Sequence, residues 1–221
     1  MRTYLLLPAL ALTLTAFMAF THLGNPAITA AQDADAAKAK AFAAFVKLFP
    51  ATTLPYNLTA EELNKSWERP AKQSATPIAR ITDTYESFMP EMNRGRFSRS
   101  GPDAFEAVAL LARGKDKVVV VFKRRHAWSP TGNYYLATYT TQGTRIASES
   151  IAGCDGRSVV RACTVTETNG VLNIITRTYR TASNDDNATN AVTSTTPKPE
   201  LVETAYASVS TKGSIDKVQR P

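Results

Sequence analysis

Histidine limits the chemistry that this sequence can perform, because the chain contains only two, His22 and His126. A Ser-His-Asp hydrolase needs a histidine as general base and a carboxylate that orients it. His126 directly follows the cations of residues 123–125, and the sequence places no carboxylate beside it. The chain also lacks the Gly-x-Ser-x-Gly motif that carries the nucleophile in many hydrolases. Catalysis by His126 is therefore kept as an alternative only.

The sequence gives little support for a catalytic carboxylate pair or for a metal site. Glu106, Glu149 and Glu167 all fall on expected strands and could form the carboxylate pair of a glycosidase, although exposed strand glutamates are common. One exported histidine and two cysteines cannot supply a usual zinc site, and no acidic stretch has the spacing of a calcium loop. We expect neither a metal nor another cofactor.

The best candidate contact surface combines cations with aromatic side chains. Such a combination suits phosphate or polysaccharide ligands, because aromatic rings and guanidinium groups bind them in different ways. The residues that we assign to this surface are Lys123, Arg124, Arg125, Trp128 and Tyr134, with further cations at Lys115, Lys117, Arg94, Arg96 and Arg99. The alternative is a solvated strand edge that lysines protect against aggregation.

Residues 1–31 predict a secretory signal peptide. Arg2 precedes an apolar run without charge that ends at Phe20, and small side chains follow near Ala30 and Ala31, where we expect cleavage. The run is nearly long enough to span a bilayer, so an uncleaved anchor is the alternative. In both cases the remaining chain is exported, to the periplasm, the cell envelope or the medium.

Export changes the interpretation of the net charge and of the two cysteines. The formal net charge of +7 would suggest nucleic acid in the cytoplasm, but outside it favours an anionic envelope polymer or a protein partner, or solubility alone. Contact with a membrane is expected only through an uncleaved N-terminal segment. Cys154 and Cys163 flank a turn-like stretch, and oxidising conditions predict a disulfide between them.

The first part of the exported chain, residues 32–100, is expected to be helical. Aromatic residues recur at helical spacing between Asp33 and Phe49, which predicts an amphipathic helix with an apolar stripe. Thr59 followed by Glu62 is a capping box, which predicts a short helix over residues 60–68. Asp83 with Glu86 repeats that pattern before another short helix.

Residues 101–221 are expected to form an antiparallel meander in the same domain. Turn pairs such as Asn169-Gly170 favour tight hairpins between neighbouring strands. The run from Val118 to Phe122 does not alternate, so we expect it to be buried on both faces. A polar stretch at 183–199 predicts a flexible loop. We predict strands at residues 104–112, 117–124, 133–139, 144–151, 159–166, 171–179, 201–209 and 214–218.

Two groups of residues resemble a known set of sequences. They are Phe49-Pro50 followed by Leu54-Pro55-Tyr56, and the stretch from Tyr134 to Tyr139 with Gln142-Gly143 at its turn. On these residues the chain resembles a group of uncharacterised exported proteins, mostly lipoproteins, of Bacteroidetes-type bacteria. The resemblance implies export and this kind of fold, and no activity. The lipid-attachment cysteine of that group is missing here.

Together these patterns predict an α+β fold, with N-terminal helices packed on a curved antiparallel β-meander of seven or eight strands. Stronger curvature would turn this sheet into an open barrel. We interpret the protein as an exported, non-enzymatic binding or interaction module. The alternative is a periplasmic hydrolase that uses carboxylates or His126.

Overall fold

A computed structural model describes residues 26–63, 79–92, 103–126, 132–155, 159–180 and 199–219. Most of the predicted signal peptide, the end of the predicted helix at 60–68 and nearly all of the predicted loop at 183–199 lie outside the described residues. The chain divides into two compact units, residues 1–40 and 41–221. None of the helices in the described ranges is long and apolar enough to cross a membrane.

The first helix of the described residues, α2 (Pro26–Val46), begins earlier than the sequence predicts. Pro26 is its first residue, a position where the missing proline N–H costs no hydrogen bond. The part of α2 in the first unit has described side chains from residue 32 to residue 40, and all of them are exposed. The helix ends at Val46, where a tighter turn carries the chain to Phe49.

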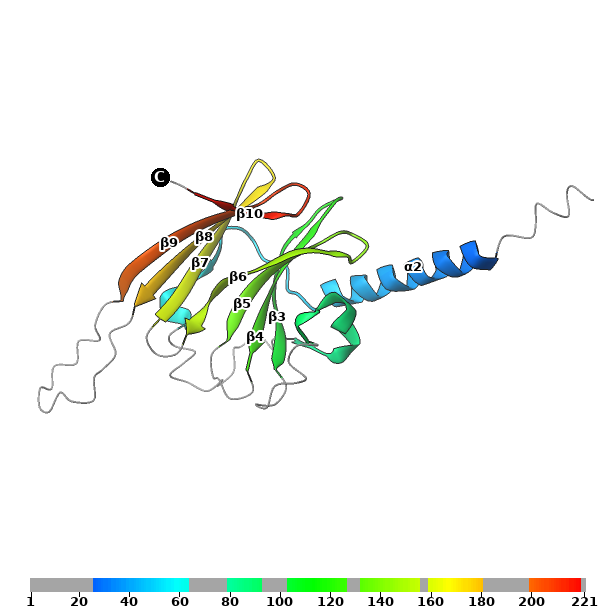
Figure 1. Cartoon of the computed structure of the whole chain (residues 1–221), viewed down its shortest axis with the longest axis horizontal. Coiled ribbons are helices and arrows are strands. Elements are labelled where there is room, and N and C mark those ends of the chain that lie inside the picture. The colour runs from blue at the N-terminus through cyan, green and yellow to red at the C-terminus, as the bar shows by residue number, and fades with distance from the viewer. Residues whose placement is uncertain are drawn as a thin grey trace, which may run out of the picture. The chain divides into compact units, whose positions relative to one another are not determined.

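The second unit is dominated by an antiparallel meander (Figure 1). Consecutive strands are hydrogen-bonded neighbours from β2 to β10, and the sheet does not close on itself. The long strands match the predicted ranges closely, because hairpin turns such as Asn169-Gly170, with positive φ at both residues, fix their ends. Their bounds are β3 (Ala104–Arg113), β4 (Val118–Arg125), β5 (Asn133–Tyr139), β6 (Arg145–Asp155), β7 (Val159–Thr168), β8 (Val171–Arg180), β9 (Glu200–Val209) and β10 (Ile215–Val218).

The described sheet has ten strands rather than the seven or eight predicted. The difference lies in two short strands, β1 (Tyr56–Leu58) and β2 (Arg80–Ile81), which are too short to produce an alternating pattern. β2 pairs with β3, whereas β1 lies off the meander and pairs with β7.

Strand β6 changes its partner near its end. Residues 145–152 pair with β5, whereas Gly153 to Asp155 pair with β7. The register shifts where Tyr134 and Tyr135 face β6, which marks a bulge. Bulges and glycines allow a strand to bend sharply and leave one sheet for another. β6 therefore joins two sections of the meander, β2–β6 and β6–β10.

Residues 50–58 connect these two sections a second time. Leu110 of β3 donates its N–H to the Pro50 carbonyl at 2.8 Å and accepts from the Thr52 N–H at 3.1 Å. The chain then continues into β1, which pairs with residues 163–165 of β7. We call residues 50–58 the crossing segment. It hydrogen-bonds to two strands that are not neighbours in the meander.

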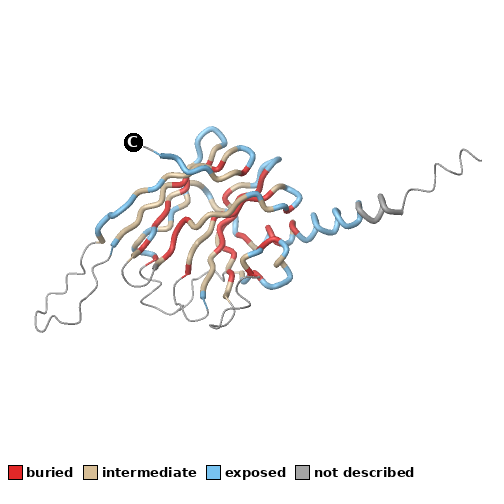
Figure 2. The backbone as a smooth tube through the Cα atoms, viewed as in Figure 1, coloured by how far each residue is buried: buried red, intermediate tan, exposed pale blue. Residues whose placement is uncertain are grey.

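Strand β4 is buried on both faces, as predicted, since residues 118–122 are all buried (Figure 2). Its two faces belong to two different apolar clusters. One face of the strand packs with the aromatic end of α2, where the Phe45 and Tyr139 ring centroids lie 5.8 Å apart. The Tyr139 hydroxyl donates to the Phe88 carbonyl at 2.9 Å, within the 3₁₀ helix η1 (Asp83–Phe88). The principal members of this cluster are Phe42, Phe45, Phe88, Met89, Phe105, Val118, Val120, Phe122 and Tyr139.

The opposite face of β4 packs against the second section of the meander. Val119 and Val121 are fully buried there, and the crossing segment contributes partly buried Tyr56 and Leu58. Strands β6 to β9 supply most of the rest, including Ile151, Val160, Cys163, Val165, Leu172, Ile174 and Val209. The two sections of the meander thus share one interior.

The two predicted caps have different outcomes. The capping box is confirmed, because the Glu62 carboxylate accepts from the Thr59 N–H at 3.1 Å and the Thr59 hydroxyl accepts from the Glu62 N–H at 3.2 Å. The second predicted cap, Asp83, is one residue late. Thr82 precedes η1 as its N-cap and makes no side-chain cap bond, so Asp83 is the first helical residue.

The contact between α2 and the β5–β6 turn predicts a difference between two glycines. A Cβ at Gly143 would lie 2.6 Å from Phe42 Cγ, whereas a Cβ at Gly170 would meet nothing within 4 Å. Both have positive φ, +83° and +76°. Gly170→Ala should lower the free energy of unfolding by about 1–2 kcal/mol through backbone strain alone. Gly143→Ala should lower it by about 1 kcal/mol or more beyond that, because Phe42 must move.

Urea unfolding of the two variants measures both effects in the same protein. Equal destabilisation by the two substitutions would mean that Phe42 does not pack against this turn.

Candidate functional site

The predicted cationic surface is divided between the two ends of β4. Lys115 and Lys117 lie at one end and residues 123–125 at the other, about 20 Å away along the strand. Lys117 is buried and donates from Nζ to the Ser210 carbonyl at 2.6 Å. Burial lowers its pKa, against the opposing effect of Glu167. Lys117 therefore holds the β9–β10 turn. The predicted partners Trp128, Arg94, Arg96 and Arg99 lie outside the described residues.

Acidic side chains neutralise two of the three cations at the end of β4. Arg124 Nη2 and Nε lie 2.6 and 2.7 Å from Oδ2 of Asp103, whose side chain is only 2% exposed. Arg125 Nη2 lies 3.4 Å from Oε1 of Glu106. Charge that is already paired contributes little further attraction to an anionic polymer. The structure thus brings Lys123, Arg124 and Arg125 together, but with their own counterions.

Lys123 and Tyr134 are in contact, as their assignment to one surface requires. The Lys123 ammonium lies 5.4 Å from the centre of the Tyr134 ring. Both residues are partly buried. Burial lowers the pKa of the Lys123 ammonium, and the negative charge of Glu106 opposes that shift. Burial also raises the pKa of Tyr134 to about 12. This pair belongs to the rim of the interior that the two sections share.

His126 has the orienting carboxylate that the sequence does not reveal. Its Nδ1 lies 2.7 Å from Asp103 Oδ1, the oxygen that Arg124 leaves free. A carboxylate at this distance suits the tautomer that has its proton on Nδ1, and in that tautomer Nε2 is the acceptor. Asp103 precedes β3 by one residue, and the β3–β4 pairing brings it to the end of β4.

The three glutamates do not form a catalytic pair. Glu106 binds Arg125, and Glu149 lies 3.7 Å from Lys217. Glu149 on β6 is three strands from Glu106 on β3, about 14 Å along the sheet, which exceeds the separation in glycosidases. Glu167 is exposed near the opposite end of the sheet, beside Lys117. Each glutamate therefore stands apart from the other two.

The predicted disulfide is wrong, because Cys154 and Cys163 are both free. The β6–β7 register places Cys154 opposite Val160, so Cys163 lies three residues further along β7. Three residues span about 10 Å, more than the roughly 7 Å between Cα atoms that a disulfide tolerates. Burial raises the pKa of Cys163 to about 12 and also raises that of Cys154. Neither thiol is a good nucleophile at neutral pH.

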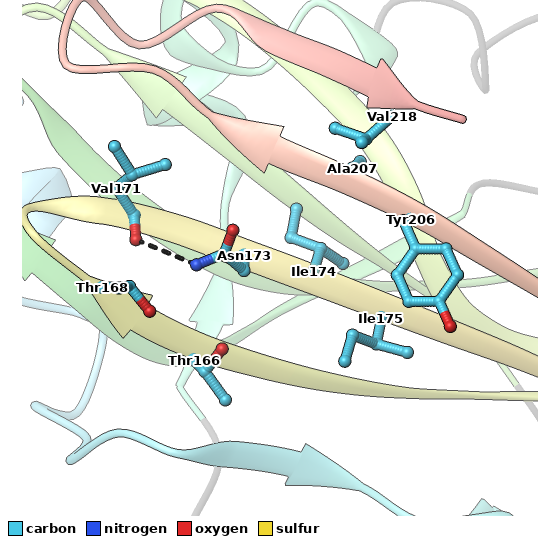
Figure 3. Close-up of a pocket in the computed structure, with 9 residues that line it drawn as sticks. All are labelled: Thr166, Thr168, Val171, Asn173, Ile174, Ile175, Tyr206, Ala207 and Val218. Carbon is cyan, nitrogen blue, oxygen red and sulfur yellow. Dashed lines mark hydrogen bonds between the residues drawn. The ribbon is translucent and has the colours of Figure 1, made fainter. Parts of the chain in front are cut away.

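A groove of about 470 Å³ crosses strands β7 to β10 (Figure 3). Thr166 of β7 faces Asn173 of β8, and Ile175 of β8 faces Tyr206 of β9. The Asn173 amide nitrogen donates to the Val171 carbonyl at 3.5 Å, which leaves its oxygen as an acceptor. The full lining is uncharged and consists of Thr166, Thr168, Val171, Asn173, Ile174, Ile175, Tyr206, Ala207 and Val218. We call this the β7–β10 groove.

Sequence reasoning missed this groove, although part of its signal was present. Thr166 and Thr168 alternate with apolar or acidic residues on β7, and the Asn169-Gly170 turn fixes which β8 residues they face. Pairing those two strands predicts a polar strip across the hairpin. Tyr206 and Val218 could not be added, because their strands follow the stretch at 181–198 and have no tight turn to set their register against β8.

The lining of the β7–β10 groove includes neither His126 nor a glutamate. No protein-family model, curated protein or solved structure matches this chain. The resemblance to exported proteins of Bacteroidetes-type bacteria therefore stays a prediction.

The buried Asp103 carboxylate predicts a clear difference between two acid-to-amide substitutions. Asp103→Asn should lower the free energy of unfolding by about 2 kcal/mol, because Arg124 loses a charged partner that is almost fully buried. Glu149→Gln should have no measurable effect, because its Lys217 partner is solvated. Denaturant unfolding at neutral pH provides the comparison. Equal stability of the two variants would show that the Asp103 contacts do not order this end of β4.

Proposed function

We propose that this chain is an exported, non-enzymatic binding module of the cell envelope or the extracellular space, and that it binds a neutral polysaccharide in the β7–β10 groove. The signal-like residues 1–31 support export. The groove itself carries the binding proposal, because it combines an aromatic side chain, hydrogen-bonding groups and apolar contacts without any charge.

The chemistry of the lining matches that of a sugar ring. A pyranose presents a face of C–H groups and an edge of hydroxyls, so it needs an apolar platform beside donors and acceptors. Tyr206 and Ile175 supply apolar surface, while Thr166 and the Asn173 oxygen supply hydrogen-bonding atoms. The volume of about 470 Å³ falls in the usual range for small-ligand sites. Because the groove runs across four strands, a linear polymer bound in it would extend past the ends of the groove.

The architecture that we propose leaves the groove accessible. The aromatic end of α2 covers one face of β4 and β5, and the crossing segment fills the interior between the two sections of the curved meander. In this arrangement the sheet curves toward an open barrel without closing. Threonine, asparagine and tyrosine side chains of β7 to β9 then have no role in either apolar cluster.

The cationic surface at the end of β4 is the weaker place for a polymer. Arg124 and Arg125 already have carboxylate partners, and Lys123 lies over Tyr134. An anionic polymer would have to compete with Asp103 and Glu106. Binding there would also weaken strongly as salt is added, whereas binding in an uncharged groove would not.

A hydrolase is the second candidate, and one contact favours it. Asp103 Oδ1 lies 2.7 Å from Nδ1 of His126, the same contact that the carboxylate makes in a Ser-His-Asp hydrolase. The same Asp103 also binds Arg124, which fits a structural role equally well. Release of shorter products from a bound glycan, lost in His126→Gln, would replace the binding proposal with this one.

The binding proposal predicts that Tyr206 dominates affinity. We expect the protein to bind members of a neutral-oligosaccharide array, and Tyr206→Ala to weaken binding of the best member by about tenfold or more. Tyr206→Phe should retain most of the affinity, because it keeps the ring. Tyr179→Ala is the matched control, since Tyr179 is a half-buried tyrosine of β8 outside the groove. Titration calorimetry at low and high salt measures each variant.

Unchanged affinity in Tyr206→Ala would contradict the proposal. Binding that disappears at high salt would instead point to the cations at residues 123–125.

A further inference from the structure

A second hollow lies where β6 passes from β5 to β7. It has a volume of about 330 Å³, and its polar lining comes from Asn133 of β5, Ser150 of β6 and Arg161 of β7. Ala152 and Val159 add apolar surface. We call it the Arg161 pocket. It shares no lining residue with the β7–β10 groove.

The pocket depends on the partner change of β6. Gly153 is the first residue of β6 that pairs with β7, and its partner in the register is Arg161. A Cβ on Gly153 would lie 2.2 Å from Asn133 Oδ1, so glycine is what lets the Asn133 side chain approach the β6 backbone. The bend therefore brings an amide, a hydroxyl and a guanidinium from three strands to one place.

Arg161 differs from the arginines that form ion pairs within the protein. Arg124, Arg125 and Arg145 are each paired with a carboxylate, and none of the ion pairs between described residues involves Arg161. Arg161 is exposed, and the lining of the pocket contains no acidic residue. The Arg161 guanidinium therefore has no acidic partner among the described residues.

We propose that the Arg161 pocket binds an anionic group, either a carboxylate or a phosphate, on a small molecule or at the end of a polymer. A guanidinium presents two parallel N–H groups, which match two oxygens of a carboxylate or phosphate. The Asn133 amide and the Ser150 hydroxyl supply further donors, and Ala152 with Val159 contact the apolar body of the ligand. This site is additional to the neutral groove and does not depend on it.

The test uses the full chain with three probes that are not sugars and so do not suit the β7–β10 groove: butyrate, inorganic phosphate and neutral butyramide. Butyrate represents a carboxylate source and phosphate a phosphoryl source, while butyramide has the shape of butyrate without its charge. We expect one of the two anions to bind and butyramide not to bind. Arg161→Gln should weaken that anion by about tenfold or more, because the charged pair is lost. Arg180→Gln is the matched control, an exposed strand arginine outside the pocket.

Calorimetry or ligand-observed nuclear magnetic resonance measures binding, and thermal unfolding verifies that each variant folds. The preferred anion identifies the source of the ligand. Equal binding in Arg161→Gln and Arg180→Gln, equal binding of butyramide and butyrate, or no binding of either anion would each overturn the proposal. Because Tyr206 variants do not alter this pocket, its failure is distinguishable from failure of the β7–β10 groove.

Discussion

Main-chain hydrogen bonds of the crossing segment constrain the rest of this structure. Residues 50–52 bond to Leu110 of β3, and residues 56–58 pair with β7, four strands away along the meander. β6 pairs with β7 only as far as Arg161, so the edge of β7 beyond Arg161 is left free to pair with β1. Once β1 occupies the edge, the two sections must face each other across one interior. The partner change of β6 and the placement of β1 therefore depend on each other.

This constraint also decides which chemical groups remain accessible. The interior takes up both cysteines, Tyr56 and most of Tyr134, and burial raises the pKa of each of them. The Tyr56 hydroxyl is buried without a hydrogen-bond partner among the described residues. Groups in such surroundings stay uncharged and unreactive near neutral pH. Among the groups that line the β7–β10 groove and the Arg161 pocket, Arg161 is exposed and Thr166 and Asn173 are only partly buried, so the proposed recognition relies on groups of this kind.

Local patterns predicted the hairpins well, because turn residues and alternation determine where a strand begins and ends. Asn169-Gly170 and the uninterrupted Val118 to Phe122 run needed no tertiary information. The errors arose where distant residues meet. Asp103 reaches His126 only through the β3–β4 register, and the spacing of Cys154 and Cys163 concealed that β6 and β7 separate between them. The crossing segment is extended and short, so its partners could not be read from its own sequence.

Hydrogen exchange of the crossing segment tests this account most directly. If β1 fills the edge of β7, the amides of residues 56–58 exchange together with those of residues 163–165, at rates close to those of the central strands. The result that would contradict it is rapid exchange at 56–58 while β4 and β5 stay protected, since the two sections would then be joined by β6 alone.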